Sequence, residues 1–156
     1  MSDVVEQTVA PTRGRSRVVA WTLRVLTTAA LAVDAFVHAD LVGRYAANQG
    51  TGPLSQGDLF RFEAVVSGLV ALGLLLTGRS TVWVVAWLVA ASAIGAMLLY
   101  RYHDPGELGP LPDMYEPLWF REKAVAGVAE GLAVVTATLG LVEHWWRSGL
   151  RPNRSS

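Results

Sequence analysis

The sequence predicts an all-α fold, an integral membrane four-helix bundle built from two tandem helical hairpins. The chain has 156 residues, of which 52% are hydrophobic and 17% charged. Its apolar residues gather in long runs, and a helix needs about 20 such residues to cross a hydrocarbon core of about 30 Å. The runs lack the polar stripe that a helix of a soluble bundle would show. We expect membrane-spanning helices at about 18–42, 59–77, 81–100 and 118–142.

The first apolar run is expected to be a retained helix and not a signal peptide. It is too long for the apolar region of a signal peptide, and Asp34 interrupts it. The four helices then form one transmembrane domain over residues 17–147. Residues 1–16 and 148–156 are expected to be disordered cytoplasmic tails.

The later helices carry recognisable start and packing signals. Ser55 and Asp58 have the spacing of a capping box, with aspartate in place of the usual glutamate. Pro117 suits the first position of the fourth helix, where a missing N–H costs nothing. Gly127 and Gly131 form a GxxxG pair, which allows another helix to approach closely.

The basic residues predict the orientation in the membrane. They gather before the first helix, in the tight second loop and after the last helix: Arg13, Arg15, Arg17, Arg79, Arg147, Arg151 and Arg154. The other two loops mix basic and acidic residues. The positive-inside rule therefore places both termini in the cytoplasm of a multi-pass protein of the bacterial plasma membrane.

Composition excludes several functional classes. The chain has no cysteine, which excludes disulfides, thiol relays and thiolate metal sites. Its formal net charge is zero, so no nucleic-acid partner is expected. No nucleophile elbow, phosphate-binding loop or metalloprotease motif is present, and an enzyme is not expected.

Two stretches of the chain resemble each other. Residues 44–65 read RYAANQGTGPLSQGDLFRFEAV, and residues 101–125 read RYHDPGELGPLPDMYEPLWFREKAV. Both begin Arg-Tyr, both reach Gly-Pro-Leu eight residues after that arginine, and both continue to Phe-Arg and Ala-Val. One interpretation is that both loops have the same turning role at the membrane surface. The other is a duplication, in which the hairpins are parallel repeats related by an axis along the membrane normal.

Ionisable residues inside the expected helices need a physical reason, because burying charge in a membrane is costly. Arg24 lies near one end of the first helix, where its long side chain can reach the head groups. Asp34 lies too deep for that, and His38 follows one turn later on the same face. The topology gathers six residues in the outer half of the bundle: Asp34, His38, Glu63, Arg61, Lys123 and Glu130.

Several roles are open for this cluster. It could be a buried network in which acids pair with His38, Arg61 and Lys123 and fix the helix packing. It could instead form a pocket for a lipid, quinone or other amphipathic head group. A metal site of Asp34, His38, His103 and Glu130 is not expected, because the HxxxH and HExxH spacings are absent. A proton or ion path would need polar residues in the inner half, where they are scarce.

The second repeated loop carries aromatic residues among charges. Tyr115, Glu116 and Trp119 either anchor the chain at the membrane interface or form a lid over the cluster. A third possibility is a docking surface for an extracytoplasmic partner. For the chain as a whole, the lipid bilayer is the expected partner, and another membrane protein or a second copy of the chain stays open.

These loop and helix patterns resemble a known family. The stretches VHADLVGRY, GPLSQGDLFRFEA, LLYRY and LGPLPDMYEPLWFREKA are similar to a family of small bacterial four-helix membrane proteins known as conserved hypothetical proteins. The resemblance covers about residues 18–142, and it implies topology and not chemistry. Size and helix count are also similar to DoxX-like proteins, which implies the alternative of a quinone- or lipid-linked accessory subunit of a membrane redox system.

Overall fold

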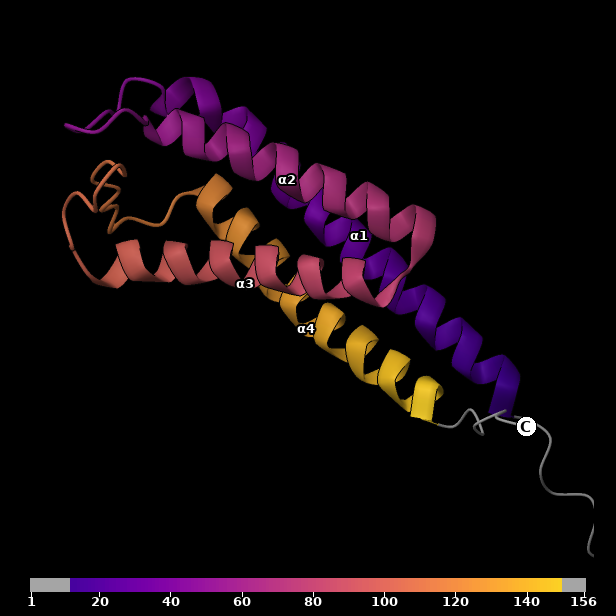
Figure 1. The fold of residues 1–156 in the computed structure, drawn as a ribbon. Helices are drawn as coiled ribbons and strands as arrows, with labels where there is room; N and C mark the ends of the chain where they lie inside the picture. Colours follow the sequence, from indigo (N-terminus) through magenta and orange to yellow (C-terminus); the bar gives the residue numbers. More distant parts are fainter. Residues whose placement is uncertain (1–11, 150–156) are drawn as a thin grey trace, which may run out of the picture.

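The computed structural model describes residues 12–149, which form four helices (Figure 1). They are α1 (Thr12–Tyr45), α2 (Gln56–Thr77), α3 (Ser80–Tyr102) and α4 (Arg121–Gly149). The described residues contain no β-strand, and the predicted all-α bundle is confirmed. Each helix is long and apolar enough to cross a membrane. The chain is therefore a small multi-pass membrane protein.

The first helix begins earlier than expected. α1 starts at Thr12, inside the segment predicted to be a disordered tail, and continues to Tyr45. Similarly, α4 runs to Gly149, beyond the expected end at residue 142. The remaining parts of the two predicted tails, 1–11 and 150–156, lie outside the described residues.

The start of α4 corrects the role expected for Pro117. The helix begins at Arg121, so Pro117 is not its first residue. The Glu116 N–H instead donates to the Tyr100 carbonyl oxygen at 3.1 Å, and the Lys123 ammonium group donates to the Glu116 carbonyl oxygen. These bonds hold the chain before α4 against the end of α3 in a non-helical path.

The predicted capping box at the start of α2 is confirmed. Ser55 Oγ accepts a hydrogen bond from the Asp58 N–H, and Asp58 Oδ2 accepts one from the Ser55 N–H, both at 3.1 Å. Each bond satisfies an N–H group that the helix cannot satisfy itself. Close to this cap, Gly57 allows α1 and α2 to approach, since a Cβ atom there would lie 2.8 Å from the Val42 carbonyl oxygen.

The four helices form a ring in which each packs against its neighbours in sequence and α4 closes on α1. Only Gly78 and Arg79 connect α2 to α3. From this short connection the two helices diverge toward the end of the bundle that carries the α1–α2 and α3–α4 loops (Figure 1). The first described residues of α1 and the last described residues of α4 lie at the opposite end of the bundle (Figure 1).

Small residues bring the helices together. The main core combines Leu31, Leu74 and Trp83 with alanines from all four helices. A Cβ atom on Gly127 would lie 2.6 Å from Met97 Cε, and one on Gly131 would lie 3.6 Å from Ile94 Cδ1. The predicted close contact through the GxxxG pair is therefore made with α3.

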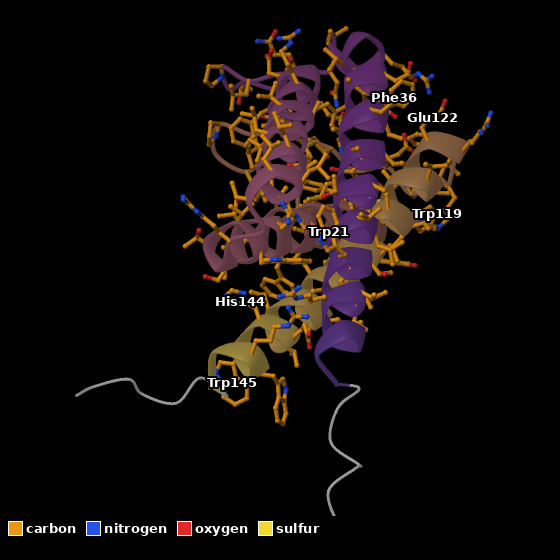
Figure 2. All side chains as sticks on the ribbon, turned by 90° about the vertical axis from the view of Figure 1, so that its right-hand side faces the viewer. Trp21, Phe36, Trp119, Glu122, His144 and Trp145 are labelled. Carbon is orange, nitrogen blue, oxygen red and sulfur yellow. The ribbon has the colours of Figure 1, made fainter. Side chains whose placement is uncertain are left out.

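Large apolar side chains cover the outer surface. Phe36 is 73% exposed and Trp145 is 72% exposed. Figure 2 shows Trp145 near the described end of α4 and Phe36 closer to the other end of the bundle. Such a surface suits a hydrocarbon environment and not water.

Arg24 does not project freely to the membrane surface as expected. Its Nε donates to the Leu74 carbonyl oxygen at 2.7 Å and its Nη2 to the Leu75 carbonyl oxygen at 2.5 Å. The last carbonyls of a helix lack internal donors, and the helix dipole makes this end negative. Arg24 of α1 thereby caps the end of α2.

The two repeated loops contact each other. The Thr51 N–H and hydroxyl group both donate to the Glu107 carboxylate, with the hydroxyl 2.5 Å from Oε2. The shared Gly-Pro-Leu letters do not have the same turn geometry, because Gly109 has φ +61° while Gly52 is not in the left-handed region. Duplication stays a prediction from the sequence.

This contact between the loops gives a pH-dependent expectation. The side-chain hydrogen bond from Thr51, and then the backbone bond, lower the pKa of Glu107 below its usual value. The contact is therefore complete above the usual glutamate pKa of about 4.3 and is lost as pH falls through the lowered folded-state pKa. NMR of the Thr51 amide should show a titration with its midpoint below the usual value. The titration should vanish in Glu107→Gln, and a midpoint at or above the usual value would contradict the contact.

Candidate functional site

A cavity of about 330 Å³ lies in the loop-end half of the bundle. It receives side chains from all four helices and from the α3–α4 loop. Its wall is mainly apolar and includes Leu41, Leu59, Phe60, Ala93, Ala96, Met97, Leu111, Met114, Phe120 and Ala126. This combination of size and apolar lining is typical of a small-molecule site.

The cavity is open between α2 and α3 because the two helices diverge and the residues of α3 at this position are small. α2 and α3 diverge toward the loops (Figure 1), and α3 contributes the small side chains of Ala93 and Ala96 to the cavity lining. Phe62 of α2, which is 66% exposed, and Ser92 of α3, which is also exposed, belong to the lining. The cavity therefore opens to the outside of the bundle between α2 and α3, where lipid chains would lie.

The inner end of the cavity is polar. His38 of α1, Glu63 of α2 and Glu130 of α4 line it. Asp34 lies behind them and is 1% exposed, while Glu130 is 2% exposed. An apolar channel thus leads to carboxyl groups that are shielded from the surroundings of the bundle.

Ser67 connects two of these acids. Its hydroxyl oxygen lies 2.7 Å from Asp34 Oδ2 and 3.0 Å from Glu63 Oε1. A hydroxyl group has one hydrogen, so it donates to only one carboxylate at a time. The link joins α1 to α2 and fixes Asp34, but it does not satisfy all the oxygens of the two acids.

His38 and Glu130 complete the polar end. His38 Nδ1 lies 2.9 Å from Asp34 Oδ1 and 3.1 Å from the Asp34 carbonyl oxygen. Although Oδ1 is this close, its angle to the ring is not that of a hydrogen bond, and Glu130 Oε2 also has no hydrogen-bond partner. The potential ligand atoms of Asp34, His38 and Glu130 all lie within 4.8 Å of one another.

The structure places four of the six predicted cluster residues together, namely Asp34, His38, Glu63 and Glu130. Lys123 lines the same cavity, but its ammonium group donates to the Glu116 carbonyl oxygen instead of an acid of the cluster.

The placement of Arg61 in the cluster is wrong. Its side chain is 64% exposed and pairs with Asp58 at 3.0 Å. Arg61 and Glu63 are two residues apart on α2, so they point to different sides of the helix. His103 is likewise outside the group that could hold a metal, because it caps the end of α3.

The α3–α4 loop covers the cavity, though mainly through residues other than those predicted. Of Tyr115, Glu116 and Trp119, only Glu116 belongs to the lining. Trp119 lies on the outside, 49% exposed, with its ring 5.7 Å from the Arg101 guanidinium carbon. This position fits the interfacial anchor among the predicted roles.

Several polar residues of the site were not predicted, and Ser67 and Tyr100 are the two that bear most on its chemistry. Ser67 follows Glu63 by one helical turn, a spacing that could have indicated it. Tyr100 lines the cavity, and its buried hydroxyl group has no partner. Its role depends on the divergence of α2 from α3, for which the sequence carries no signal.

Comparisons with known proteins do not identify this site. No protein-family model, curated protein or solved structure matches the chain. What the protein binds must therefore be inferred from the cavity and from the polar groups at its inner end.

Proposed function

We propose that this membrane protein binds an amphipathic ligand of the lipid or quinone type in the cavity between α2 and α3. The observation that carries the proposal is the form of this cavity. Its apolar walls open to the outside of the bundle, and its closed end presents Glu63 and Glu130. An apolar chain would lie between the helices while the head group reaches the acids.

The polar atoms specify the head group further. The Tyr100 hydroxyl group is buried without a partner and is available as a donor. Glu130 Oε2 is available as an acceptor. A head group that combines a carbonyl oxygen with a hydroxyl group would satisfy both, and buried polar groups gain most when they are paired.

A quinol has two ring hydroxyl groups, each of which can donate to the Glu130 carboxylate or accept from the Tyr100 hydroxyl group, and this supports the alternative of an accessory subunit in a membrane redox system. His38 and the nearby carboxyl groups would then be placed to exchange protons with the ring oxygens. A glycerol-based lipid offers similar polar atoms. The test below separates the two by the mass of the bound molecule.

The proposed location is the bacterial plasma membrane with both termini in the cytoplasm. The arginines Arg13, Arg15 and Arg17 at the start of α1 and Arg79 at the α2–α3 connection support this orientation. The cavity, which lies at the opposite end of the bundle, would then take its ligand from the outer leaflet.

Filling the cavity should remove the ligand. Ala96→Trp places a large ring among the lining side chains and should reduce ligand occupancy at least 10-fold. The matched control is Leu88→Trp, which alters an exposed position of α3 outside the lining. Native mass spectrometry of the three detergent-purified proteins measures the occupancy.

The expected result is a discrete added mass on the wild type and on Leu88→Trp that is absent from Ala96→Trp. The mass then identifies a lipid or a quinone. Bare protein in all three samples, or an equal added mass in all three, would contradict binding in the cavity. It would favour a polar cluster that serves only to hold the helices together.

A further inference from the structure

We propose that Asp34, His38 and Glu130 bind a divalent transition-metal ion at the closed end of the cavity. This inference goes beyond the proposed function and does not rest on it. The three ligands come from α1 and α4, whereas the cavity mouth lies between α2 and α3. The ion would be of the class that accepts one imidazole nitrogen together with carboxylate oxygens, such as Zn²⁺ or Mn²⁺.

The backbone places the ligands suitably. Asp34 and His38 are four residues apart on α1 and so share a face, and α4 brings Glu130 to the same point. All three potential ligand atoms lie within 4.8 Å of one another. Ligands about 2.1 Å from a tetrahedral ion are separated by roughly 3.4 Å. Rotation of the two carboxyl groups can close the remaining distance of at most about 1.4 Å.

A second observation points to a missing electrophile. Glu130 is 2% exposed, yet its Oε2 atom accepts no hydrogen bond. Asp34 is 1% exposed, and its Oδ1 atom also accepts no hydrogen bond and has only the ion-pair contact with His38 Nδ1. Leaving a buried carboxylate oxygen without a donor or a cation is costly. One ion between the two side chains would satisfy both oxygens. A metal-bound carboxylate keeps further lone pairs, so a head group in the cavity could still donate to Glu130.

The charge balance leads to the same conclusion. Three acids, Asp34, Glu63 and Glu130, meet a single histidine in the apolar part of the bundle. Within residues 17–147, their only ion pair is the one between Asp34 and His38. A divalent cation offsets two negative charges. A proton shared between the carboxyl groups would meet the same need, and the experiment below separates the two.

The surroundings resemble the outer shell of a metal site. Ser67 donates to Asp34 Oδ2 at 2.7 Å and leaves Oδ1 on the side of His38. Such outer hydrogen bonds orient the ligands, and their loss commonly weakens metal binding by about 10- to 100-fold. Ser67 is therefore expected to act as a positioning residue for Asp34.

The test is metal binding by the full-length protein, prepared without a histidine tag and treated with EDTA. Equilibrium dialysis against Zn²⁺ or Mn²⁺, followed by elemental analysis, should show one ion per chain. Glu130→Gln and Asp34→Asn preserve shape but remove negative charge, and each should weaken binding at least 10-fold. Ser67→Ala keeps all three ligands and should weaken binding by about 10-fold.

The control is His103→Gln, which removes an exposed histidine outside the group and should leave binding unchanged. Size-exclusion chromatography and circular dichroism report whether each variant is folded. X-ray absorption of the zinc-loaded wild type should show one imidazole nitrogen and carboxylate oxygens, and it does not depend on the folding of any variant.

The metal site would be overturned, in favour of a shared proton, if the wild type bound no zinc. Equal zinc binding by the wild type and by a folded Glu130→Gln variant would overturn it in the same way. Loss of binding in His103→Gln would also overturn it. The cavity-filling Ala96→Trp should retain the ion. A wild-type protein that binds the amphipathic ligand but no metal ion would overturn the metal site and leave the proposed function standing. A wild-type protein that binds a metal ion but no amphipathic ligand would overturn the proposed function and leave only the metal site.

Discussion

Gly57→Ala is expected to lower the free energy of unfolding by about 3 kcal/mol. The added Cβ atom would lie 2.8 Å from Ala46 Cα and 2.8 Å from the Val42 carbonyl oxygen. Both are backbone atoms, one in the last turn of α1 and one in the residue that follows it, so neither can move aside by rotating a side chain. Relief requires α1 and α2 to separate, which would also disturb the capping box between Ser55 and Asp58.

Gly68→Ala is the matched control on the same helix. Its new Cβ atom would meet only Ala35 Cβ, at an ordinary 3.9 Å. Because both variants make the same chemical change in α2, their difference isolates the close helix contact. Unfolding of the purified proteins in mixed micelles measures it, and equal stabilities of Gly57→Ala and Gly68→Ala would contradict the packing described.

Asp34→Ala is the second substitution with a large expected effect. It removes the acceptor of the Ser67 hydroxyl group and the partner of His38, both in the buried part of the bundle. Removing one member of a buried charged pair typically costs about 3–5 kcal/mol, and we expect a loss of about 3 kcal/mol. Unfolding in EDTA-containing micelles measures the effect without a contribution from bound metal.

Asp34→Asn keeps an oxygen acceptor for Ser67 and should recover about half of the lost stability. Asp40→Asn makes the same change at an exposed position of α1 and should have little effect. An Asp34→Ala protein as stable as Asp40→Asn would mean that Asp34 contributes nothing to helix packing.

The helices were the most predictable part of the molecule. Long apolar runs have few alternatives to a membrane helix, and the Ser55–Asp58 cap is a local pattern. The start of α4 was less predictable, because it depends on a bond between Glu116 and the distant Tyr100. Arg24 shows the same limit, since its acceptors lie on another helix.

The site was predictable only where residues share one helix. Asp34 and His38 are related by helical spacing, and so are Glu63 and Ser67. The position of Arg61 along α2 put it near the depth of the polar cluster in the membrane. Its side chain, however, projects from a different side of α2 and lies at the surface. The cavity arises from the divergence of α2 and α3, a tertiary property that no local pattern encodes.

The most direct test of the central claim is an experimental structure of the protein crystallised from lipid bicelles with its native ligand retained. We expect elongated density between α2 and α3, with a polar end within hydrogen-bonding distance of Tyr100 Oη and Glu130. A bundle in which α2 and α3 close on each other, with side chains filling the space beside Ala96, would contradict it.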